Sequence, residues 1–318
     1  MSKTRAIILA AGLGTRMKSS LPKVLHPIGN TTLLGMVVRS LKLAGIKEII
    51  AVVGYRADLV EEMLKGEDIS FVKQEKQMGS GDALKSAAIY LEDISGNTIV
   101  TCGDAPLITG DTYKRLLNNS VMFPEIACTM LTCDVENPFS YGRIVRDKEG
   151  NVTRIVEEKD ANDEQKKIKE VNVGTYCFHN VDFKKYLAEI RINEKKQEYY
   201  LTDIVEIMNS YSKKVGAVSC VREEFIGVNS RQDLAIVNKL FNNRVLEQFM
   251  NNGVTILDPN TIFIDENVVI GEDTVIFPFT IIEAGAKIGK NCKLGPFVRI
   301  VKGTVLEAGE SVSSSVEL

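Results

Sequence analysis

Two glycines and two basic residues follow a short apolar stretch near the start of the sequence. Residues 6–11 are apolar, Gly12 and Gly14 come next, and Arg16 and Lys23 follow. The stretch is too short for a buried helix and predicts a buried parallel strand, after which the glycines turn the chain out of the sheet. Open α/β sheets bind ligands at this edge, where glycine lets backbone N–H groups approach an anion and basic side chains neutralise it. The segment therefore predicts a site for the phosphates of a nucleoside triphosphate.

Two common nucleotide-binding motifs do not fit this spacing. The dinucleotide fingerprint requires a third glycine or alanine three residues after Gly14, where the sequence has Met17. The P-loop requires Gly-Lys followed by serine or threonine, which the segment lacks. A nicotinamide oxidoreductase and a P-loop are therefore excluded.

The segment as a whole resembles the signature of the sugar nucleotidyltransferases, also called NDP-sugar pyrophosphorylases. That signature is a strand followed by Leu-Ala-Ala-Gly-x-Gly-Thr-Arg-Met and a downstream Pro-Lys, which here are residues 9–17 and 22–23. The resemblance implies an enzyme that transfers a nucleotidyl group to a sugar 1-phosphate. It also implies that the nucleotide is bound by Leu9, Ala10, Ala11, Gly12, Gly14 and Thr15.

The implied reaction needs charge stabilisation rather than a protein nucleophile. The attacking oxygen of a sugar 1-phosphate is already anionic, so the protein has to align two anions and neutralise the charge on the α-phosphate and on the leaving pyrophosphate. Arg16 and Lys23 are therefore the candidate catalytic residues. We expect Arg16 to bind the leaving phosphates and Lys23 to bind the α-phosphate.

An acidic residue after a second apolar strand is the candidate magnesium ligand. Asp104 follows residues 98–102, so its carboxylate is expected at the carboxyl edge of the sheet, beside the triphosphate. Mg²⁺ takes oxygen ligands and keeps several waters, so one or two protein groups suffice. The family resemblance adds Asn229, in the segment Gly-Val-Asn-Ser-Arg, as the second ligand. From the residues alone, Asn229 is expected to be the N-cap of the helix that follows, and the two roles are compatible.

A glutamine-rich segment is the candidate site for the base. Residues 74–83, Gln-Glu-Lys-Gln-Met-Gly-Ser-Gly-Asp-Ala, are similar to the family's Gln-x-x-Gln-x-Gly-Thr-x-His-Ala. Gln74 can donate to and accept from a uracil edge, while Gly79 and Ser80 can approach it through the backbone. Ser80 replaces the usual threonine and keeps the hydroxyl. Asp82 replaces the usual histidine, and the sequence assigns it no role.

Three further segments resemble the uridylyltransferase half of the bifunctional enzymes that make UDP-N-acetylglucosamine. They are residues 140–144, 156–161 and 170–174, and Glu-Tyr-Tyr-Leu-Thr-Asp follows at 198–203. Cys102 stands where that family usually has tyrosine, which predicts a looser choice of sugar; its thiol is expected to be structural rather than nucleophilic. The resemblance implies that the sugar is bound by Gly142, Glu157, Asn172 and Thr202.

The composition is that of an ordinary globular protein. The 318 residues are 44% hydrophobic and 25% charged, with a formal net charge of -3. This balance gives no basic field for nucleic acid, and no apolar run approaches the length that spans a membrane. We therefore expect a cytoplasmic protein with no nucleic-acid or membrane partner. Six dispersed cysteines and two histidines argue against a disulfide framework or a zinc site.

Alternating segments predict the sheet that positions these residues. Between residues 5 and 110, strand patterns at 49–54 and 98–102 alternate with helical spacing at 33–43, 57–64 and 80–91. This alternation predicts an α/β fold, a Rossmann-like sheet with helices on both faces. Strands at 126–133, 143–146, 152–157 and 171–178 are expected to add antiparallel pairs, with a hairpin turn at 147–151. Helical spacing at 234–250 predicts a connecting helix.

A six-residue repeat governs the end of the chain. An aliphatic residue recurs at every sixth position, and the position two residues earlier is often small or β-branched. No helix repeats every six residues, and the pattern resembles the left-handed parallel β-helix. The aliphatic positions are Ile264, Ile270, Ile276, Ile282, Ile288, Leu294, Ile300, Leu306 and Val312. The positions two residues earlier are Val268, Thr274, Thr280, Ala286, Cys292, Val298 and Thr304.

These patterns predict a nucleotidyltransferase domain at residues 1–230, a connecting helix at 231–252 and a short left-handed β-helix of about three coils at 253–318. The resemblance implies Mg²⁺ as cofactor, UTP and N-acetylglucosamine 1-phosphate as substrates, and a homotrimer formed along the coils. In the bifunctional enzymes, later coils build the acetyltransferase site, so we expect uridylyl transfer without acetyl transfer. Two alternatives stay open: a pyrophosphorylase for glucose 1-phosphate or another sugar phosphate, and a non-catalytic nucleotide-sugar sensor or scaffold.

Overall fold

A computed structural model describes residues 4–91, 95–181, 183–194 and 196–313. The chain separates into two compact units. The first consists of Met1–His26 and Leu33–Asp233, and the second consists of Pro27–Thr32 and Leu234–Leu318. The short segment Pro27–Thr32 groups with the second unit, although it is far from the rest of that unit in sequence.

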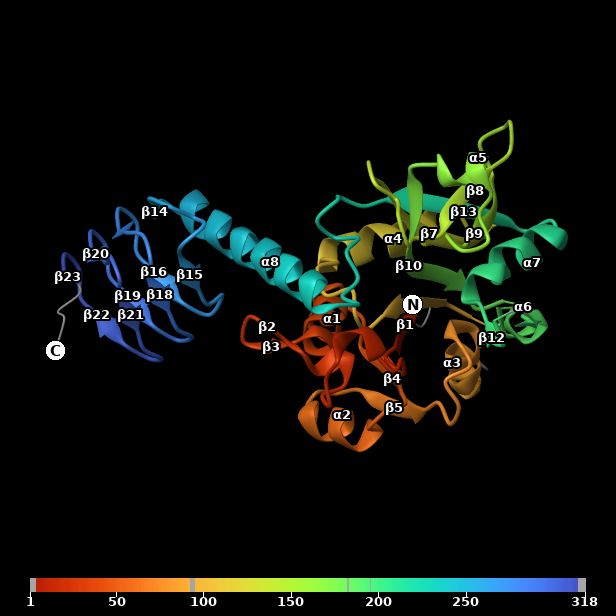
Figure 1. Cartoon of the computed structure of the whole chain (residues 1–318), viewed down its shortest axis with the longest axis horizontal. Coiled ribbons are helices and arrows are strands. Elements are labelled where there is room, and N and C mark those ends of the chain that lie inside the picture. Colours follow the sequence, from red (N-terminus) through yellow and green to blue (C-terminus); the bar gives the residue numbers. More distant parts are fainter. Residues whose placement is uncertain (1–3, 92–94, 182, 195, 314–318) are drawn as a thin grey trace. The chain divides into compact units, whose positions relative to one another are not determined.

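A mixed sheet forms the centre of the first unit (Figure 1). In the described residues it has nine strands, with the order β13-β7-β10-β6-β1-β4-β5 and a hairpin of β8 and β9 attached to β10. Strands β6, β1, β4 and β5 are parallel to one another, whereas β10 runs antiparallel to both β6 and β7. The strands are β1 (Thr4–Leu9), β4 (Glu48–Val53), β5 (Ser70–Lys73), β6 (Asn97–Cys102), β7 (Ile126–Asp134), β8 (Arg143–Arg146), β9 (Val152–Val156), β10 (Glu170–His179) and β13 (Lys214–Ser219).

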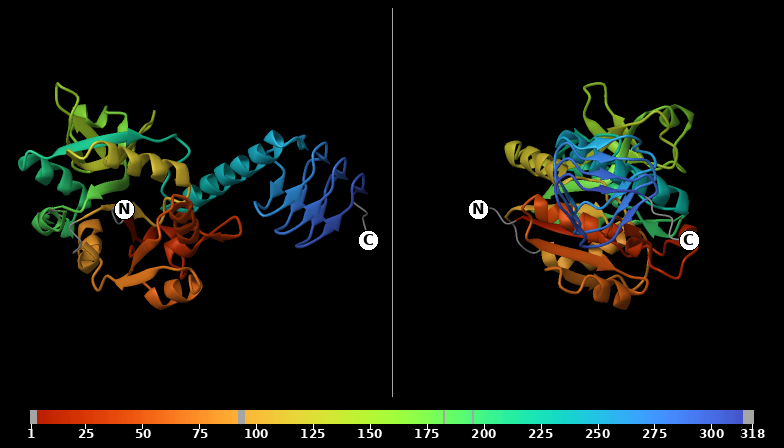
Figure 2. Two further views of the ribbon diagram at one scale, coloured as in Figure 1. Left: turned by 180° about the vertical axis from the view of Figure 1, so that it is seen from behind. Right: turned by 90° about the vertical axis from the view of Figure 1, so that its left-hand side faces the viewer.

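Helices cover both faces of this sheet because its central strands are apolar on both sides. In β1, Ala6 and Ile8 face one core and Ile7 faces the other. The first core is closed by α1 (Leu33–Leu43), α2 (Ala57–Met63) and α4 (Gly110–Met122). The second core is closed by α3 (Ser80–Ser86), α6 (Phe183–Glu189) and α7 (Ile204–Ser210). The predicted Rossmann-like arrangement of a sheet between two helical layers is confirmed (Figure 2).

The carboxyl ends of β1 and β6 meet at one edge of the sheet. The two strands are parallel and paired so that Leu9 lies opposite Cys102. Beyond this pair, the backbone N–H of Gly103 donates to the carbonyl of Leu9 at 2.9 Å. The glycine-rich loop and the segment that contains Asp104 therefore leave the sheet side by side, as expected from the sequence.

Short elements complete the first unit. A 3-10 turn at Ala88–Leu91 follows α3, so the single helix expected at 80–91 is in fact α3 and a separate turn. Helix α4 has no counterpart among the expected segments, because its first turn is polar and its apolar residues are few. The remaining elements are α5 (Asp163–Lys166), β11 (Ile192–Asn193), β12 (Glu198–Tyr199) and 3-10 turns at Thr15–Met17, Lys23–Leu25 and Leu201–Asp203. Among the described residues, no helix has the length and apolar character needed to cross a lipid bilayer.

The second unit is a parallel β-helix preceded by α8 (Arg231–Asn251) and a small hairpin of β2 (Pro27–Ile28) and β3 (Thr31–Thr32). Ten strands of two residues each pair in parallel across successive coils; Phe263, for example, lies opposite Ile281. Leu246 of α8 packs into the core of the coils. The strands are β14 (Thr255–Ile256), β15 (Phe263–Ile264), β16 (Val269–Ile270), β17 (Val275–Ile276), β18 (Ile281–Ile282), β19 (Lys287–Ile288), β20 (Lys293–Leu294), β21 (Arg299–Ile300), β22 (Val305–Leu306) and β23 (Ser311–Val312).

The six-residue repeat sets the inside of these coils. The nine aliphatic positions of the repeat each form the second residue of a strand, and most are buried. The small positions also point inward: Thr274, Ala286 and Cys292 are fully buried. The Thr274 hydroxyl donates to the carbonyl of Gly289 and accepts from the backbone N–H of Cys292, so this polar group is satisfied inside the coils. The prediction of a short left-handed parallel β-helix is confirmed.

A buried carboxylate fixes the start of α4 in the first unit. Glu224 is only 2% exposed and accepts hydrogen bonds from the backbone N–H of Thr109 at 3.0 Å, the hydroxyl of Thr109 at 2.6 Å and the hydroxyl of Thr112 at 2.8 Å. These bonds tie the loop after β13 to the N-terminus of α4, where a negative charge is favourable. The same loop continues to Val228 and Asn229, so Glu224 also anchors a segment of the predicted site.

Replacing Glu224 tests this anchor. Glu224→Ala removes the acceptor that the N–H of Thr109 and the buried hydroxyl of Thr112 share, and we expect the free energy of unfolding to fall by about 2 kcal/mol. The neighbouring Glu223 is exposed, so Glu223→Ala is the matched control and should change stability little. The free energy of unfolding of both variants is measured by urea unfolding monitored by circular dichroism. Equal stabilities for the two variants would contradict the anchoring role.

Candidate active site

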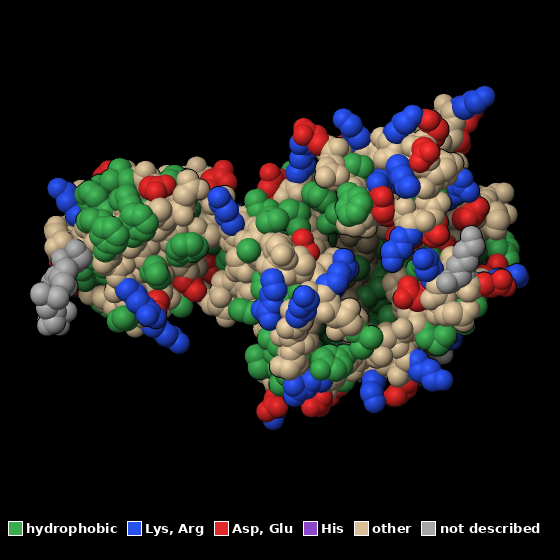
Figure 3. All heavy atoms as spheres, viewed as in Figure 1, with side chains coloured by type: hydrophobic (Ala, Val, Ile, Leu, Met, Phe, Trp, Pro, Cys, Tyr) green, Lys and Arg blue, Asp and Glu red, His purple; other side chains and the backbone are tan. Residues whose placement is uncertain are grey.

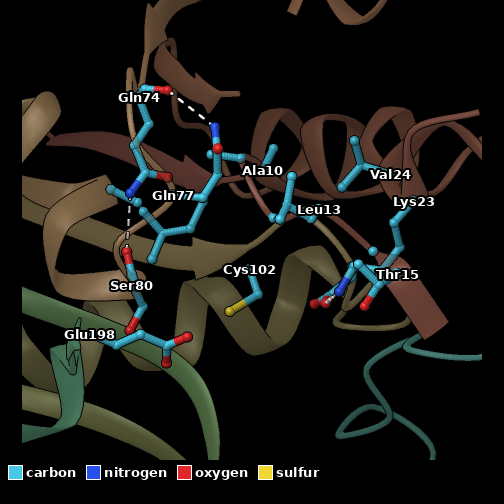
Figure 4. A pocket seen from close by; sticks show the side chains of 17 residues that line it. Ala10, Leu13, Thr15, Lys23, Val24, Gln74, Gln77, Ser80, Cys102 and Glu198 are labelled. Carbon is cyan, nitrogen blue, oxygen red and sulfur yellow. Dashed lines mark hydrogen bonds and ion pairs between the residues drawn. The ribbon is translucent and has the colours of Figure 1, made fainter. Parts of the chain in front are cut away.

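A pocket of about 390 Å³ opens at the carboxyl edge of the sheet in the first unit. It is formed by the loop after β1, the segment between β5 and α3, the end of β6 and strand β12 (Figure 4). Most residues expected at the nucleotide site line it. These are Leu9, Ala10, Ala11, Gly12, Gly14, Thr15, Lys23, Gln74, Gly79, Ser80 and Asp104.

Lys23 connects the two expected metal ligands at one end of the pocket. Its ammonium forms an ion pair with the carboxylate of Asp104 and donates a hydrogen bond to Oδ1 of Asn229 at 3.1 Å. The side chains of Lys23 and Asp104 are 13% and 19% exposed, so the ion pair is largely shielded from water. Three segments that are far apart in sequence therefore meet at a single charged group.

The glycine-rich loop packs closely against Lys23. Gly14 has a left-handed backbone with φ of 61°, and a Cβ atom at this position would lie 2.8 Å from Cβ of Lys23. Only glycine satisfies both constraints without strain. Arg231 adds a second tie, because its Nε donates to the carbonyl of Met17 at 3.1 Å. The loop is thus held from both sides in the first unit.

Asn229 is positioned by its backbone neighbours and is not the cap of α8. The backbone N–H of Val228 donates to the carbonyl of Asp104 at 2.8 Å, which places Asn229 beside Asp104. The helix is capped by the next residue: the hydroxyl of Ser230 accepts from the N–H of Asp233, and the carboxylate of Asp233 accepts from the N–H of Ser230. The expected N-cap role of Asn229 is therefore wrong, because this reciprocal pair already occupies the helix start.

The chemistry of this cluster fits a divalent cation. The carboxylate oxygen of Asp104 and the amide oxygen of Asn229 converge on the positively charged ammonium of Lys23, which shows that the two oxygens can serve one cation. Carboxylate and amide oxygens are the ligand types that Mg²⁺ prefers, and Mg²⁺ completes its shell with water and substrate phosphates. Asp104 and Asn229 are thus suited to hold such an ion.

The base end of the pocket is built around Gln74. This side chain is 3% exposed, and its Nε2 donates to the carboxylate of Asp82 at 2.7 Å and to the carbonyl of Gly79 at 3.2 Å. Gly79 has a φ of 99°, and a Cβ there would lie 2.6 Å from the carbonyl oxygen of Tyr199. The Ser80 hydroxyl accepts from the backbone N–H of Leu201 at 3.1 Å. The base segment and residues 198–203 are therefore joined by direct hydrogen bonds.

The four residues expected at the sugar form a cluster beside the pocket rather than in its lining. The Thr202 hydroxyl donates to Glu157 at 3.0 Å, and the backbone N–H of Asn172 donates to the carbonyl of Gly142 at 2.9 Å. A Cβ on Gly142 would lie 2.8 Å from a methyl group of Ile155, so a larger residue would displace the β9 strand. The structure brings these four residues together.

An irregularity in β10 connects this cluster to the pocket. The register with β7 shifts between Asn172 and Tyr176, where Gly174 has a φ of 77°. The side chain of Asn172 donates to the hydroxyl of Tyr176 at 2.8 Å and accepts from the N–H of Gly174 at 3.1 Å. The thiol of Cys102 lies 3.6 Å from the carbonyl of Gly174 and lines the pocket. Burial, followed by the nearby Asp104, raises the pKa of Cys102 to about 12, so the thiol is protonated and is not a nucleophile.

Two discrepancies concern the lining of the pocket. Arg16 is exposed in the 3-10 turn at Thr15–Met17 and does not line the pocket in this structure. Conversely, six lining residues were not among the nucleotide-binding, catalytic or metal-binding residues expected from the sequence, although Gln77, Ala83 and Glu198 lie within the motif segments 74–83 and 198–203. The six residues are Leu13, Val24, Gln77, Ala83, Cys102 and Glu198.

Comparisons with known proteins agree with this geometry. Residues 6–148 match the family model of the MobA-like NTP transferase domain, and residues 267–302 match six repeats of the bacterial transferase hexapeptide. The chain is 45% identical over 312 residues to the bifunctional protein GlmU of Acetivibrio thermocellus, covering 98% of this chain and 67% of that protein. The chain belongs to the GlmU family. It is therefore an enzyme of the nucleotidyltransferase type.

Further relatives in the GlmU family show the same extent of similarity. The GlmU protein of Caldanaerobacter subterraneus is 43% identical over 305 residues, which cover 96% of this chain and 66% of that protein. The chain thus spans just under two thirds of the length of several curated relatives that it matches. A crystal structure of a candidate glucose-1-phosphate thymidylyltransferase from Bacillus anthracis superposes with a TM-score of 0.60 at 20% identity, covering 75% of this chain and 95% of that one. This last likeness concerns the fold.

Acidic groups gather around the sugar cluster and perturb one another. Burial raises the pKa of Glu157, and the hydrogen bond from Thr202 partly opposes this. Burial also raises the pKa of Asp203 to about 6, and the nearby carboxylates of Glu157, Glu206 and Asp160 add to the shift. The charged form of Asp203 is therefore unfavourable in the folded protein.

The shift at Asp203 predicts a pH dependence of stability. Its pKa is about 6 when folded and about 3.9 when unfolded, so the folded state holds this proton more tightly than the unfolded state does. The free energy of unfolding therefore falls as the pH rises from about 4 to about 6. Asp203→Asn should therefore be more stable than the natural chain at pH 7, by about 1 kcal/mol after solvent screening, and equally stable near pH 4. Urea unfolding across this range measures the difference. Asp111→Asn, at an exposed position of α4, should show no comparable pH-dependent gain, and a gain of that size in this control would sink the assignment.

Proposed function

We propose that this chain transfers a uridylyl group from UTP to N-acetylglucosamine 1-phosphate, which gives UDP-N-acetylglucosamine and pyrophosphate. The observation that carries the proposal is the cluster of Lys23, Asp104 and Asn229, in which Lys23 and Asp104 line the same pocket as the glycine-rich loop. Membership of the GlmU family and the resemblance of residues 140–174 to the uridylyltransferase half of its bifunctional members support the choice of substrates. UDP-N-acetylglucosamine is a cell wall precursor.

The proposed chemistry uses electrostatic stabilisation. The sugar phosphate oxygen is an anion and attacks the α-phosphate without a protein base, so the protein contributes positive charge and alignment. Backbone N–H groups of the loop at Gly12 and Gly14 bind phosphate oxygens, and the ammonium of Lys23 neutralises charge on the α-phosphate. Arg16 is exposed beside this loop and is proposed to bind the leaving pyrophosphate once substrate is present.

Magnesium is the proposed cofactor. Asp104 and Asn229 would hold the ion, and a bound Mg²⁺ supplies positive charge to the triphosphate. The ammonium of Lys23 contacts the same two oxygens. This arrangement keeps the carboxylate of Asp104 neutralised and positioned, so the ligands are organised before the nucleotide binds.

Specific contacts are proposed at both ends of the substrate pair. Gln74, Gly79 and Ser80 bind the base at one end of the pocket. On the sugar side, Glu157 and Asn172 offer a carboxylate and an amide to the hydroxyl and N-acetyl groups, while Gly142 gives them room to approach. The hydroxyl of Thr202 holds Glu157 in place.

The small side chain of Cys102 favours a second candidate substrate. Cys102 lines the pocket next to Gly174, the position that connects the nucleotide pocket to the sugar cluster. A thiol restricts this passage less than the tyrosine usual in the family. Glucose 1-phosphate or another sugar 1-phosphate is therefore the alternative acceptor.

A homotrimer is proposed on the strength of the exposed apolar surface of the second unit, and a cytoplasmic location is proposed from membership of the GlmU family. Hydrophobic side chains gather on the surface of the coils (Figure 3), and the rings of Phe279 and Phe297 stack there at a centroid distance of 4.8 Å. These rings are 52% and 67% exposed. Exposed apolar patches of this kind are typical of surfaces that bind another protein chain.

A substrate panel tests the proposed function. Pyrophosphate release is measured with UTP, CTP, ATP, GTP and dTTP against N-acetylglucosamine 1-phosphate and glucose 1-phosphate, with Mg²⁺. We expect the highest kcat/KM for UTP with N-acetylglucosamine 1-phosphate; absence of turnover with this pair would overturn the proposal. Acetyl-CoA and glucosamine 1-phosphate serve as the companion assay, and release of free CoA thiol would contradict the expectation of uridylyl transfer without acetyl transfer.

Substitution of Asp104 tests the proposed metal site. Asp104→Asn keeps the size of the side chain but removes its negative charge, so we expect turnover to fall by at least about a hundredfold. The melting temperature should fall because Lys23 loses its ionic partner, so the rate is measured at a temperature at which circular dichroism shows the variant to be folded. Asp111→Asn should retain full activity as the matched control. Pyrophosphate release at saturating Mg²⁺ measures the rate. An undiminished rate would remove Asp104 from the site.

A further inference from the structure

We propose that Asp82 is a positioning residue that locks the side-chain amide of Gln74, so that Gln74 presents only a hydrogen-bond acceptor to the base. This lock selects a base with an N–H at position 3, such as uracil, over cytosine. The inference rests on the proposed nucleotide site and deepens it, because it assigns the choice of base to a contact between two residues of this chain.

The hydrogen bonds of Gln74 leave one polar atom for the ligand. The two N–H groups of Nε2 are both used, one by Oδ2 of Asp82 at 2.7 Å and one by the carbonyl of Gly79 at 3.2 Å. Figure 4 shows this nitrogen turned toward the segment at Ser80 and the amide oxygen turned away from it. The side chain lines the pocket although it is only 3% exposed, so its remaining oxygen is the group available there.

The carboxylate of Asp82 decides which way the amide is turned. A carboxylate only accepts hydrogen bonds, as does the carbonyl of Gly79. Rotation of the Gln74 amide by half a turn would place its oxygen against both acceptors, with lone pairs facing lone pairs. A buried polar atom without a partner destabilises the fold, and a bond to a charged acceptor is stronger than one to a carbonyl. The contact to Asp82 is therefore the stronger of the two that fix the orientation.

A fixed acceptor distinguishes the two common pyrimidines. Uracil has an N–H at position 3 and can donate it to the oxygen of Gln74. Cytosine has a lone pair at position 3, which would face that oxygen without a hydrogen atom between them. A site that is built to pair with a substrate N–H rejects an analogue that lacks it, because the buried group of the protein stays unpaired. Gln74 in this orientation therefore favours UTP.

The lock assigns a role to a residue that the sequence left without one. Asp82 does not line the pocket, so it acts through Gln74 and not by touching the nucleotide. An asparagine at this position has the same size but can also donate a hydrogen bond. It would accept either orientation of the Gln74 amide, and the amide could then present its N–H groups to cytosine.

The test is the binding preference of Asp82 variants for UTP and CTP, measured without any sugar phosphate. Isothermal calorimetry with Mg²⁺ gives both dissociation constants. We expect the natural chain to bind UTP at least about tenfold more tightly than CTP, which corresponds to about 1.4 kcal/mol. Asp82→Asn should bring the ratio close to one. Asp82→Ala, which removes the acceptor without adding a donor, should give an intermediate ratio.

Controls separate the lock from a general loss of structure. Asp111→Asn makes the same chemical change in the first turn of another helix and should keep the ratio of the natural chain. Asp82→Glu retains a carboxylate and should restore most of the preference. If Asp82→Asn does not fold by circular dichroism, Asp82→Ala decides. An unchanged ratio in the folded Asp82 variants, or an equal change in Asp111→Asn, overturns the proposal.

The binding assay also distinguishes this inference from the proposed function. A chain that prefers UTP in the manner described, but shows no turnover with UTP and N-acetylglucosamine 1-phosphate, would overturn the proposed reaction and leave the lock intact. A chain that turns these substrates over but binds UTP and CTP equally would overturn the lock and leave the reaction intact.

Discussion

The contact on which the site depends is the ammonium of Lys23 between the carboxylate of Asp104 and the amide oxygen of Asn229. It joins the loop after β1, the segment after β6 and the segment before α8. A largely buried charge is tolerated only when it is paired and hydrogen-bonded, so the three segments have to meet with good geometry. The same oxygens that hold the lysine are suited to a divalent cation, which gives one arrangement both a structural and a proposed functional role.

The architecture of the sheet explains why these segments can meet. Parallel β1 and β6 end at the same level, so their loops leave the sheet as neighbours. Antiparallel β10 then brings Asn172 to this edge, and the bulge at Gly174 turns the backbone toward Cys102. Glu224 fixes the loop after β13 to the start of α4 and so helps to hold Asn229. The regular strands therefore bring the site segments to one edge of the sheet, and the bulge in β10 sets the local direction of the backbone there.

The two ends of the site obey different physical constraints. At the phosphate end, positive charge and backbone N–H groups dominate, and modest changes of geometry still leave an attraction between opposite charges. At the base end, hydrogen bonds with a fixed donor and acceptor dominate, so the orientation of one amide changes which base can pair. This contrast explains why the phosphate residues follow a short motif, whereas the base preference is assigned to a contact between Gln74 and Asp82.

The sequence by itself determined the features that local pattern controls. Apolar period and turn residues predicted the strands, the hairpin at 147–151 and the β-helix, because side-chain spacing directly sets which residues face a core. The glycine-rich motif predicted where the pocket lies, and the family resemblance predicted that Asn229 lies beside Asp104. Only the tertiary structure decided the hydrogen bond between Gln74 and Asp82, the capping of α8 by Ser230 and the exposure of Arg16. Each of these depends on the direction of a single side chain, which is set by neighbours in space and by the acceptors and donors already in use, and residue types along the chain do not specify it.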